Sequence, residues 1–125
     1  MSLKKEKNII PPNNLKLYDK LIATNSNIER KGDTMPYTSL NGHMYTFLSK
    51  TGSLCIRLPK DERENFIKKF NTTLCEAHGA IMKEYVSVPD ASLQNTNVLK
   101  KYLDLSYGYV KTLKPKPAKG SKLAK

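Results

Sequence analysis

Cysteine and histidine side chains are the first candidates for chemistry, because two of them stand at a metal-binding spacing. Cys75 and His78 are separated by two residues, which is one half of a typical zinc-binding pattern. Cys55 and His43 are conceivable partners, but the sequence holds no second closely spaced pair. We therefore favour a buried thiol and a turn histidine, and we expect neither a metal nor a cofactor.

A thiol nucleophile needs an electropositive, partly exposed setting, and Cys55 near Arg57 is the one candidate for it. Both Cys55 and Cys75 lie in apolar stretches, so we expect free, buried, structural cysteines. A disulfide is the alternative, and a reducing compartment disfavours it. The sequence has no Gly-rich phosphate loop and no Gly-x-Ser-x-Gly motif. These observations predict that the chain is not an enzyme.

Glu84 is the most unusual polar residue in the predicted strands. Strand alternation places it on the face of Met82 and Val86, with Lys83 and Tyr85 on the other face. A carboxylate on an apolar face needs a partner or a shifted pKa. We favour a structural ion pair with a lysine or arginine, and a polar anchor in a binding groove is the alternative.

Polar and aromatic side chains are also predicted on a sheet face that helices leave open. Arg57 should lie opposite the core residues of its strand, and aromatic side chains should lie nearby. Such a surface suits a nucleic-acid strand or an acidic peptide, and an ordinary solvated sheet face is the alternative. Together with the Glu84 anchor, the candidate binding surface comprises Tyr37, Tyr45, Arg57, Lys83, Glu84 and Tyr85.

Short-range signals predict the elements that position these residues in the first half of the chain. Two prolines and two asparagines over 11–14 precede apolar residues at helical spacing and predict a helix over about 14–25. Asn41-Gly42 predicts a hairpin between strands at 35–40 and 44–48. Alternating apolar residues predict a third strand over 54–58.

The second half predicts two more strands between two helices. Asp61 and Glu64 stand at the spacing of an N-cap pair, for a helix over about 61–71. Strands are expected at 74–76 and 81–88, and a last helix after Asn95, although Gly108 inside it costs about 1 kcal/mol. The order α-β-β-β-α-β-β-α predicts an α+β two-layer sandwich, with a five-stranded antiparallel sheet and helices on one face.

The net charge of +11 is concentrated at the two ends of the chain. Between residues 8 and 110, thirteen basic residues face ten acidic ones. We divide the chain into a flexible basic N-terminus (1–12), one domain (13–113) and a Lys/Pro-rich tail (114–125). Six basic side chains run from the end of the last helix through this tail, namely Lys111, Lys114, Lys116, Lys119, Lys122 and Lys125. The tail is interpreted as a solvated segment, with weak polyanion binding or docking of an extended segment as alternatives.

The predicted location of the protein depends on the length of its apolar segments. They are far shorter than the roughly 20 residues that cross a bilayer, and no apolar segment follows the basic start of the chain. We therefore expect no membrane association and a cytoplasmic location.

Several short motifs, in their order and spacing, resemble those of one known family. They are Lys31-Gly32, Met35-Pro36-Tyr37-Thr38, Asn41-Gly42-His43-Met44, Arg57-Leu58-Pro59, Met82-Lys83-Glu84-Tyr85-Val86 and Leu113-Lys114-Pro115-Lys116-Pro117. Over about residues 15–117 the chain resembles the TfoX N-terminal domain family, in particular its short stand-alone bacterial members. The resemblance implies a two-layer sandwich on a five-stranded antiparallel sheet, an association with regulation of transcription and competence, and no catalytic residues.

These observations lead to three functional hypotheses. The first is a non-enzymatic interaction or regulatory module that binds a protein partner or itself through its sheet. The second is a nucleic-acid-binding accessory protein that uses its basic ends, with weak, nonspecific contacts. The third is a small-ligand-binding protein, which depends on Glu84 and Cys55 alone.

Overall fold

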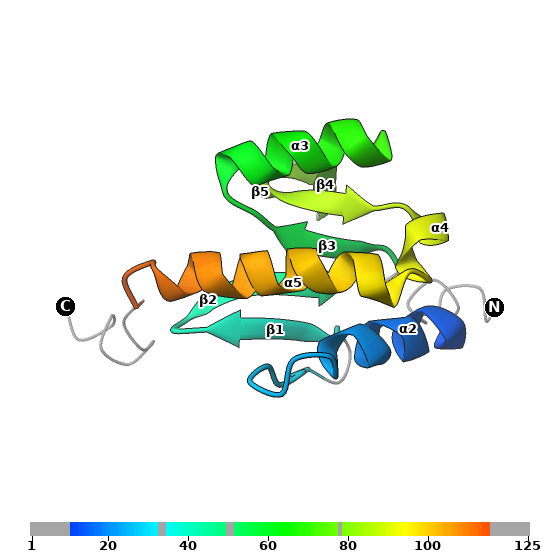
Figure 1. The fold of residues 1–125 in the computed structure, drawn as a ribbon, viewed down its shortest axis with the longest axis horizontal. Helices are drawn as coiled ribbons and strands as arrows, with labels where there is room; N and C mark the ends of the chain where they lie inside the picture. Colours follow the sequence, from blue (N-terminus) through cyan, green and yellow to red (C-terminus); the bar gives the residue numbers. More distant parts are fainter. Residues whose placement is uncertain (1–10, 33–34, 50–51, 78, 116–125) are drawn as a thin grey trace.

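The computed structural model describes residues 11–32, 35–49, 52–77 and 79–115. The predicted N-terminal segment and the tail beyond Pro115, including Lys116, Lys119, Lys122 and Lys125, lie outside these residues, as does His78. Figure 1 shows the elements in chain order. They are α2 (Pro12–Ile22), β1 (Tyr37–Leu40), β2 (His43–Leu48), β3 (Leu54–Arg57), α3 (Lys60–Phe70), β4 (Leu74–Ala77), β5 (Ala80–Val88), α4 (Asp90–Leu93) and α5 (Thr96–Lys111).

The five strands form one antiparallel sheet in the order β1-β2-β3-β5-β4. Asn41 and Gly42 join β1 to β2 with φ angles of 56° and 85°, as a tight hairpin turn between paired strands requires. The predicted α+β class, the order of the main elements and the five-stranded antiparallel sheet are confirmed. The short helix α4 was not predicted, because four residues are too few to show helical periodicity.

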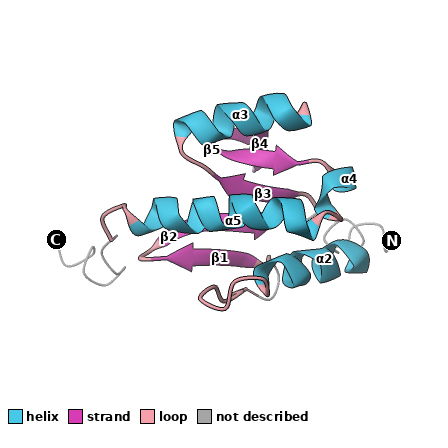
Figure 2. Ribbon diagram, in the orientation of Figure 1, coloured by secondary structure: helices cyan, strands magenta, loops and turns pink. Residues whose placement is uncertain are grey.

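The long helices lie together on one face of the sheet, and none of the helices that the structure describes lies on the other face (Figure 2). We call this second face the back face. The main core fills the space between the helices and the sheet, and Leu54, Ile56 and Val86 point into it from the strands. Tyr18 of α2 is fully buried there, and its hydroxyl is 2.8 Å from Thr46 Oγ1, which in turn is 2.7 Å from Thr38 Oγ1. This chain of hydrogen bonds gives each of the three buried hydroxyls, those of Tyr18, Thr38 and Thr46, a partner.

Proline residues, and no polar side chains, stand at the N-cap positions of α2 and α3. Pro11 is the N-cap of α2, and Asn14 instead donates from Nδ2 to the carbonyl of Gly52 at 2.8 Å. Pro59 is the N-cap of α3, with no side-chain hydrogen bond, and Asp61 lies within the first turn. A carboxylate there still favours the helix, because it lies near the positive end of the helix dipole.

Helix α5 runs unbroken through Gly108, and the stripe of apolar residues along it, which includes Leu99, Leu103 and Val110, is buried. Packing of this stripe outweighs the low helix propensity of glycine. None of the helices among the residues that the structure describes is long and apolar enough to cross a membrane.

Candidate functional site

The structure does not bring the six predicted surface residues together. Tyr45 is buried against α5, where its ring centroid lies 6.0 Å from that of Tyr107 and its carbonyl accepts a hydrogen bond from Ser106 Oγ at 3.3 Å. The pairing of β1 with β2 shifts between Thr38 and Ser39, so Tyr45 is an extra residue of β2. Such a bulge breaks strict alternation, and the prediction that Tyr45 belongs to the open face is wrong.

Because Tyr45 is buried, the free energy of unfolding is expected to decrease at alkaline pH. Burial raises the pKa of its phenol from 10.0 to about 12, and a hydrogen bond to Thr38 opposes this shift. The folded state therefore keeps the phenol protonated where the unfolded chain loses the proton. We expect the contribution of Tyr45 to be complete below pH 10 and to disappear as the pH rises to about 12. Urea unfolding between pH 10 and about 12 measures this decrease in the free energy of unfolding, which should be smaller in the Tyr45→Phe variant than in the wild-type chain. Equal losses in both proteins would contradict the assignment.

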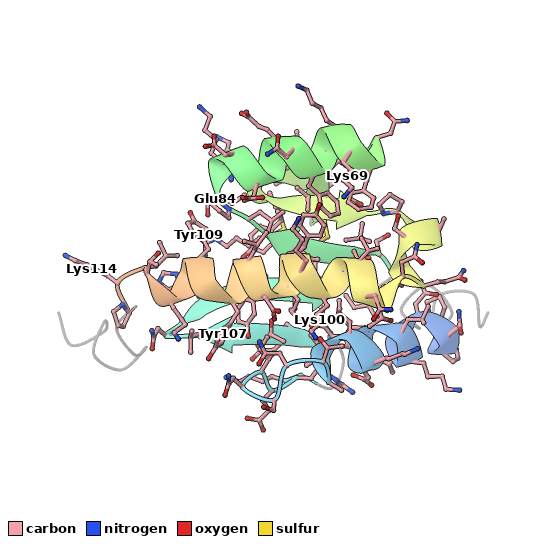
Figure 3. All side chains as sticks on the ribbon, viewed as in Figure 1. Lys69, Glu84, Lys100, Tyr107, Tyr109 and Lys114 are labelled. Carbon is pink, nitrogen blue, oxygen red and sulfur yellow. A yellow bond between two sulfur atoms is a disulfide. The ribbon has the colours of Figure 1, made fainter. Side chains whose placement is uncertain are left out.

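Arg57 of β3 and Glu84 of the neighbouring strand β5 form an ion pair. Arg57 Nη2 lies 2.6 Å from Glu84 Oε1, and the guanidinium carbon lies 5.6 Å from the centroid of the Tyr109 ring of α5. Figure 3 shows Glu84 and Tyr109 next to each other beside the C-terminal half of α5. The charged end of Arg57 is thus on the helix side, not on the back face as predicted. Glu84 has the ion-pair partner that the structural alternative expected.

Tyr37 and Tyr85 do share the back face. The Tyr85 hydroxyl donates to the carbonyl of Met44 at 2.5 Å, and its ring centroid lies 5.7 Å from that of Phe47. Burial raises the pKa of Tyr85, so this donor stays protonated further into the alkaline range than an exposed phenol would. Tyr85 therefore crosses β3 and ties β5 to β2. Lys83 is exposed.

The back face carries a second apolar cluster that the sequence reasoning missed. Phe47, Cys55 and Cys75 form its buried centre. Partly buried side chains surround this centre, namely Met35, Tyr37, Met44, Met82 and Tyr85. The chain has four methionines, and the three beyond Met1 all belong to this cluster. Their positions in predicted strands were a signal that could have identified this surface.

A register shift explains why Met82 lies on this face and not on the face of Val86. Leu74 pairs with Val86, whereas the next residue of β4, Cys75, pairs with Met82. Residues 83–85 of β5 thus have no partner in β4, and the alternation that was predicted for Glu84 and Met82 does not hold through them. Bulges of this kind bend and twist a strand.

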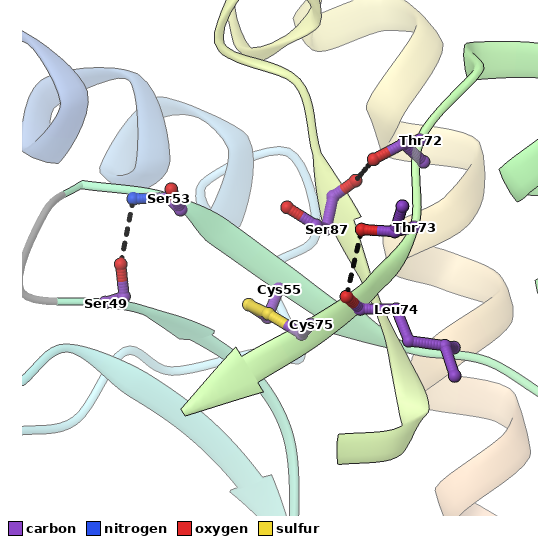
Figure 4. The surroundings of a disulfide bond; sticks show 8 residues. All are labelled: Ser49, Ser53, Cys55, Thr72, Thr73, Leu74, Cys75 and Ser87. Atoms are coloured by element: carbon purple, nitrogen blue, oxygen red, sulfur yellow. Dashed lines mark hydrogen bonds between the residues drawn. A yellow bond between two sulfur atoms is a disulfide. The ribbon is translucent and has the colours of Figure 1, made fainter. Parts of the chain in front are cut away.

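The bend brings β4 close to β3, and a disulfide joins Cys55 to Cys75 (Figure 4). The two Cα atoms are 6.1 Å apart, although β5 lies between these strands in the hydrogen-bonding order. The prediction of two free cysteines is wrong. The two residues lie on strands that are not neighbours in the sheet, and the sequence does not show that these strands approach each other. Disulfides are typical of oxidising compartments, so this feature does not favour the predicted cytoplasmic location.

The candidate reactive groups are engaged in other contacts. Cys55 has no free thiol in the disulfide, and His43 Nε2 lies 2.7 Å from the carbonyl oxygen of Lys114. Within the described ranges, no group of three or more His, Cys, Asp or Glu side chains is placed to hold a metal ion.

Comparison of the chain with models of known protein families, with curated proteins and with solved structures finds no match in any of the three. The resemblance to the TfoX N-terminal domain family is therefore a proposal that depends on the motifs in the sequence.

Proposed function

We propose that this chain is a non-enzymatic interaction module that binds a protein partner through the back face of its sheet. The observation that carries the proposal is the gathering of Met35, Tyr37, Met44, Met82 and Tyr85 on a face that no described helix covers. Methionine and tyrosine are enriched in protein interfaces, because they combine apolar contact area with adaptable packing or a polar tip.

The buried centre of the back face gives this surface a firm base. Phe47 and Cys55 are about 1% and 0% exposed, and the disulfide and the Tyr85–Met44 hydrogen bond connect the strands around them. A partner would thus meet flexible methionine side chains on a rigid frame, which limits the entropy lost on binding.

The resemblance to the TfoX N-terminal domain family supports the same type of role. It adds the proposal that the module acts in the regulation of transcription or competence. The engagement of Cys55 in the disulfide and of Glu84 in an ion pair supports a non-enzymatic role and speaks against the small-ligand alternative.

The test uses the methionines themselves as probes. A photoreactive methionine analogue, incorporated into the full chain in cells, should cross-link a partner, or a second copy of the chain, from Met35, Met44 and Met82. Affinity for the purified cross-linked protein is then measured with Met82→Glu and with Val98→Glu. Val98 lies on α5 and is 40% exposed, so it provides a matched apolar-to-acidic control on the other side of the molecule.

We expect Met82→Glu to weaken binding roughly 30-fold, the loss typical of a central interface residue, and Val98→Glu to leave it unchanged. Circular dichroism confirms that both variants are folded. An absence of cross-links from the three methionines would contradict the proposal, and so would equal affinities of the two variants.

A further inference from the structure

A row of exposed lysines lies on the opposite side of the molecule, on the outward surface of α5. Asn97, Lys101, Asp104, Gly108 and Lys111 follow one another at spacings of three and four residues, which places them on one stripe of the helix. Lys101 and Lys111 are exposed on this stripe on either side of Gly108. We call this stripe the basic stripe.

Neighbouring lysines extend the basic stripe in both directions. Two surface depressions adjoin at Asn97, one of about 470 Å³ lined by Lys100 and Lys101, and one of about 310 Å³ lined by Lys20 of α2. At the other end, Lys114 is exposed just beyond the helix (Figure 3). The residues that follow carry four more lysines and no acid in the sequence.

Few acidic groups oppose this charge. Among the described residues of α2 and α5, the acids are Asp19 and Asp104. Asp19 pairs with Arg30 at 2.9 Å, whereas Asp104 accepts a hydrogen bond at 3.0 Å from the neutral amide of Asn25 and keeps its negative charge. The two helices carry five lysines against these two acids. The surface around α5 therefore keeps a net positive charge, whereas the seven charged residues of α3 are four bases and three acids.

Gly108 has no role in the fold that would require a glycine. Its backbone is helical, it is exposed, and a Cβ atom added to it would meet nothing within 4 Å apart from its two chain neighbours and the backbone of its own helix. A glycine at such a place costs about 1 kcal/mol relative to alanine. What it provides is a flat site between Tyr107 and Tyr109, where a ligand can approach the helix backbone closely.

We propose that the basic stripe binds the phosphodiester backbone of a nucleic acid. Lys101 and Lys111 would each neutralise a phosphate on either side of Gly108, and Lys100 and Lys114 would extend the contact along the strand. The charge of the surface is complementary to such a backbone, and lysine binds phosphate as a point charge. This site is separate from the back face, so either proposal can fail without the other.

The experiment measures binding of the full chain to a labelled DNA duplex of random sequence by fluorescence anisotropy at several salt concentrations. The test variant is Lys101→Gln with Lys111→Gln. The control is Lys68→Gln with Lys69→Gln, two exposed lysines of α3, so both variants lose the same net charge.

We expect the test variant to lower the slope of log affinity against log salt by about 1.8, and to weaken binding roughly 60-fold at 0.1 M salt. Gly108→Gln should raise the urea midpoint of unfolding yet reduce the affinity, a combination that a purely structural role would not give. The α3 control should keep the wild-type slope.

Three results would overturn the proposal. Equal losses in both double variants would reduce the binding to attraction by net charge. No measurable binding of the wild-type chain at 0.1 M salt would exclude a nucleic-acid site. Competition by polyglutamate as effective as that by unlabelled DNA, at equal charge, would identify the stripe as a site for acidic peptides.

Discussion

Replacing Cys55 and Cys75 together by alanine is expected to lower the free energy of unfolding by about 3 kcal/mol. The disulfide closes a loop between residues 20 positions apart, and the entropy that it removes from the unfolded chain corresponds to roughly this value. Both side chains are buried in the back-face cluster, so the exchange also removes two sulfur atoms from apolar packing.

Urea unfolding of the wild-type chain with and without reductant provides the measurement. Reductant should lower the wild-type midpoint nearly to that of the double variant, and it should leave the variant unchanged, which serves as the control. The expectation would be contradicted if the denatured wild-type chain, without reductant, had two titratable thiols and its urea midpoint did not change when reductant was added. These results would show that the disulfide does not form.

The same bond should hold β4 in place on the back face. β4 is an edge strand of four residues, and its pairing with β5 is interrupted next to Cys75. Reduction should therefore speed amide hydrogen exchange in β4 more than in β2, which has a partner strand on each side. The shape of the proposed protein-binding face thus depends on a covalent link as well as on packing.

Local signals were sufficient to predict most of the fold. Asn41-Gly42 requires two positive φ angles, which few other residue pairs adopt, and the hairpin formed where they stand. The apolar residues of α5 follow a period that only a helix satisfies, and Leu99, Tyr102, Leu103 and Val110 are buried along one stripe even with Gly108 within the helix. Both signals depend on residues that are close together in the chain, so they can be recognised in the sequence without knowledge of the tertiary structure.

The candidate site was harder to predict because it depends on pairings between distant residues. The extra residue Tyr45 in β2 and the interrupted pairing of residues 83–85 in β5 each reverse the face of the side chains beyond them. A period of two cannot reveal such shifts, since the shift is a property of the partner strand as well. The cysteine pair was missed for the same reason, because the interrupted pairing between β4 and β5 lies next to Cys75 and the sequence does not show where it occurs.

Phe66→Ala is expected to have the largest effect on stability, a loss of about 4 kcal/mol in the free energy of unfolding. Phe66 is fully buried, and its ring centroid lies 4.8 Å from that of Tyr102 of α5 in an edge-to-face contact and 4.4 Å from that of Phe70. It is the one residue of α3 that is fully buried against the sheet and α5. Truncation leaves a cavity that the surrounding helices and strands cannot fill.

Phe70→Ala is the matched control, because it removes the same ring from the same helix. Phe70 is only partly buried, with its ring centroid 5.8 Å from that of Tyr102, so a loss of about 2 kcal/mol is expected. The free energies of unfolding of the two variants are compared through the midpoints and slopes of their urea unfolding curves. Equal losses of unfolding free energy in the two variants would contradict this prediction. The packing of α3 against the sheet would then depend on the aromatic contacts at the end of the helix and not on the burial of Phe66.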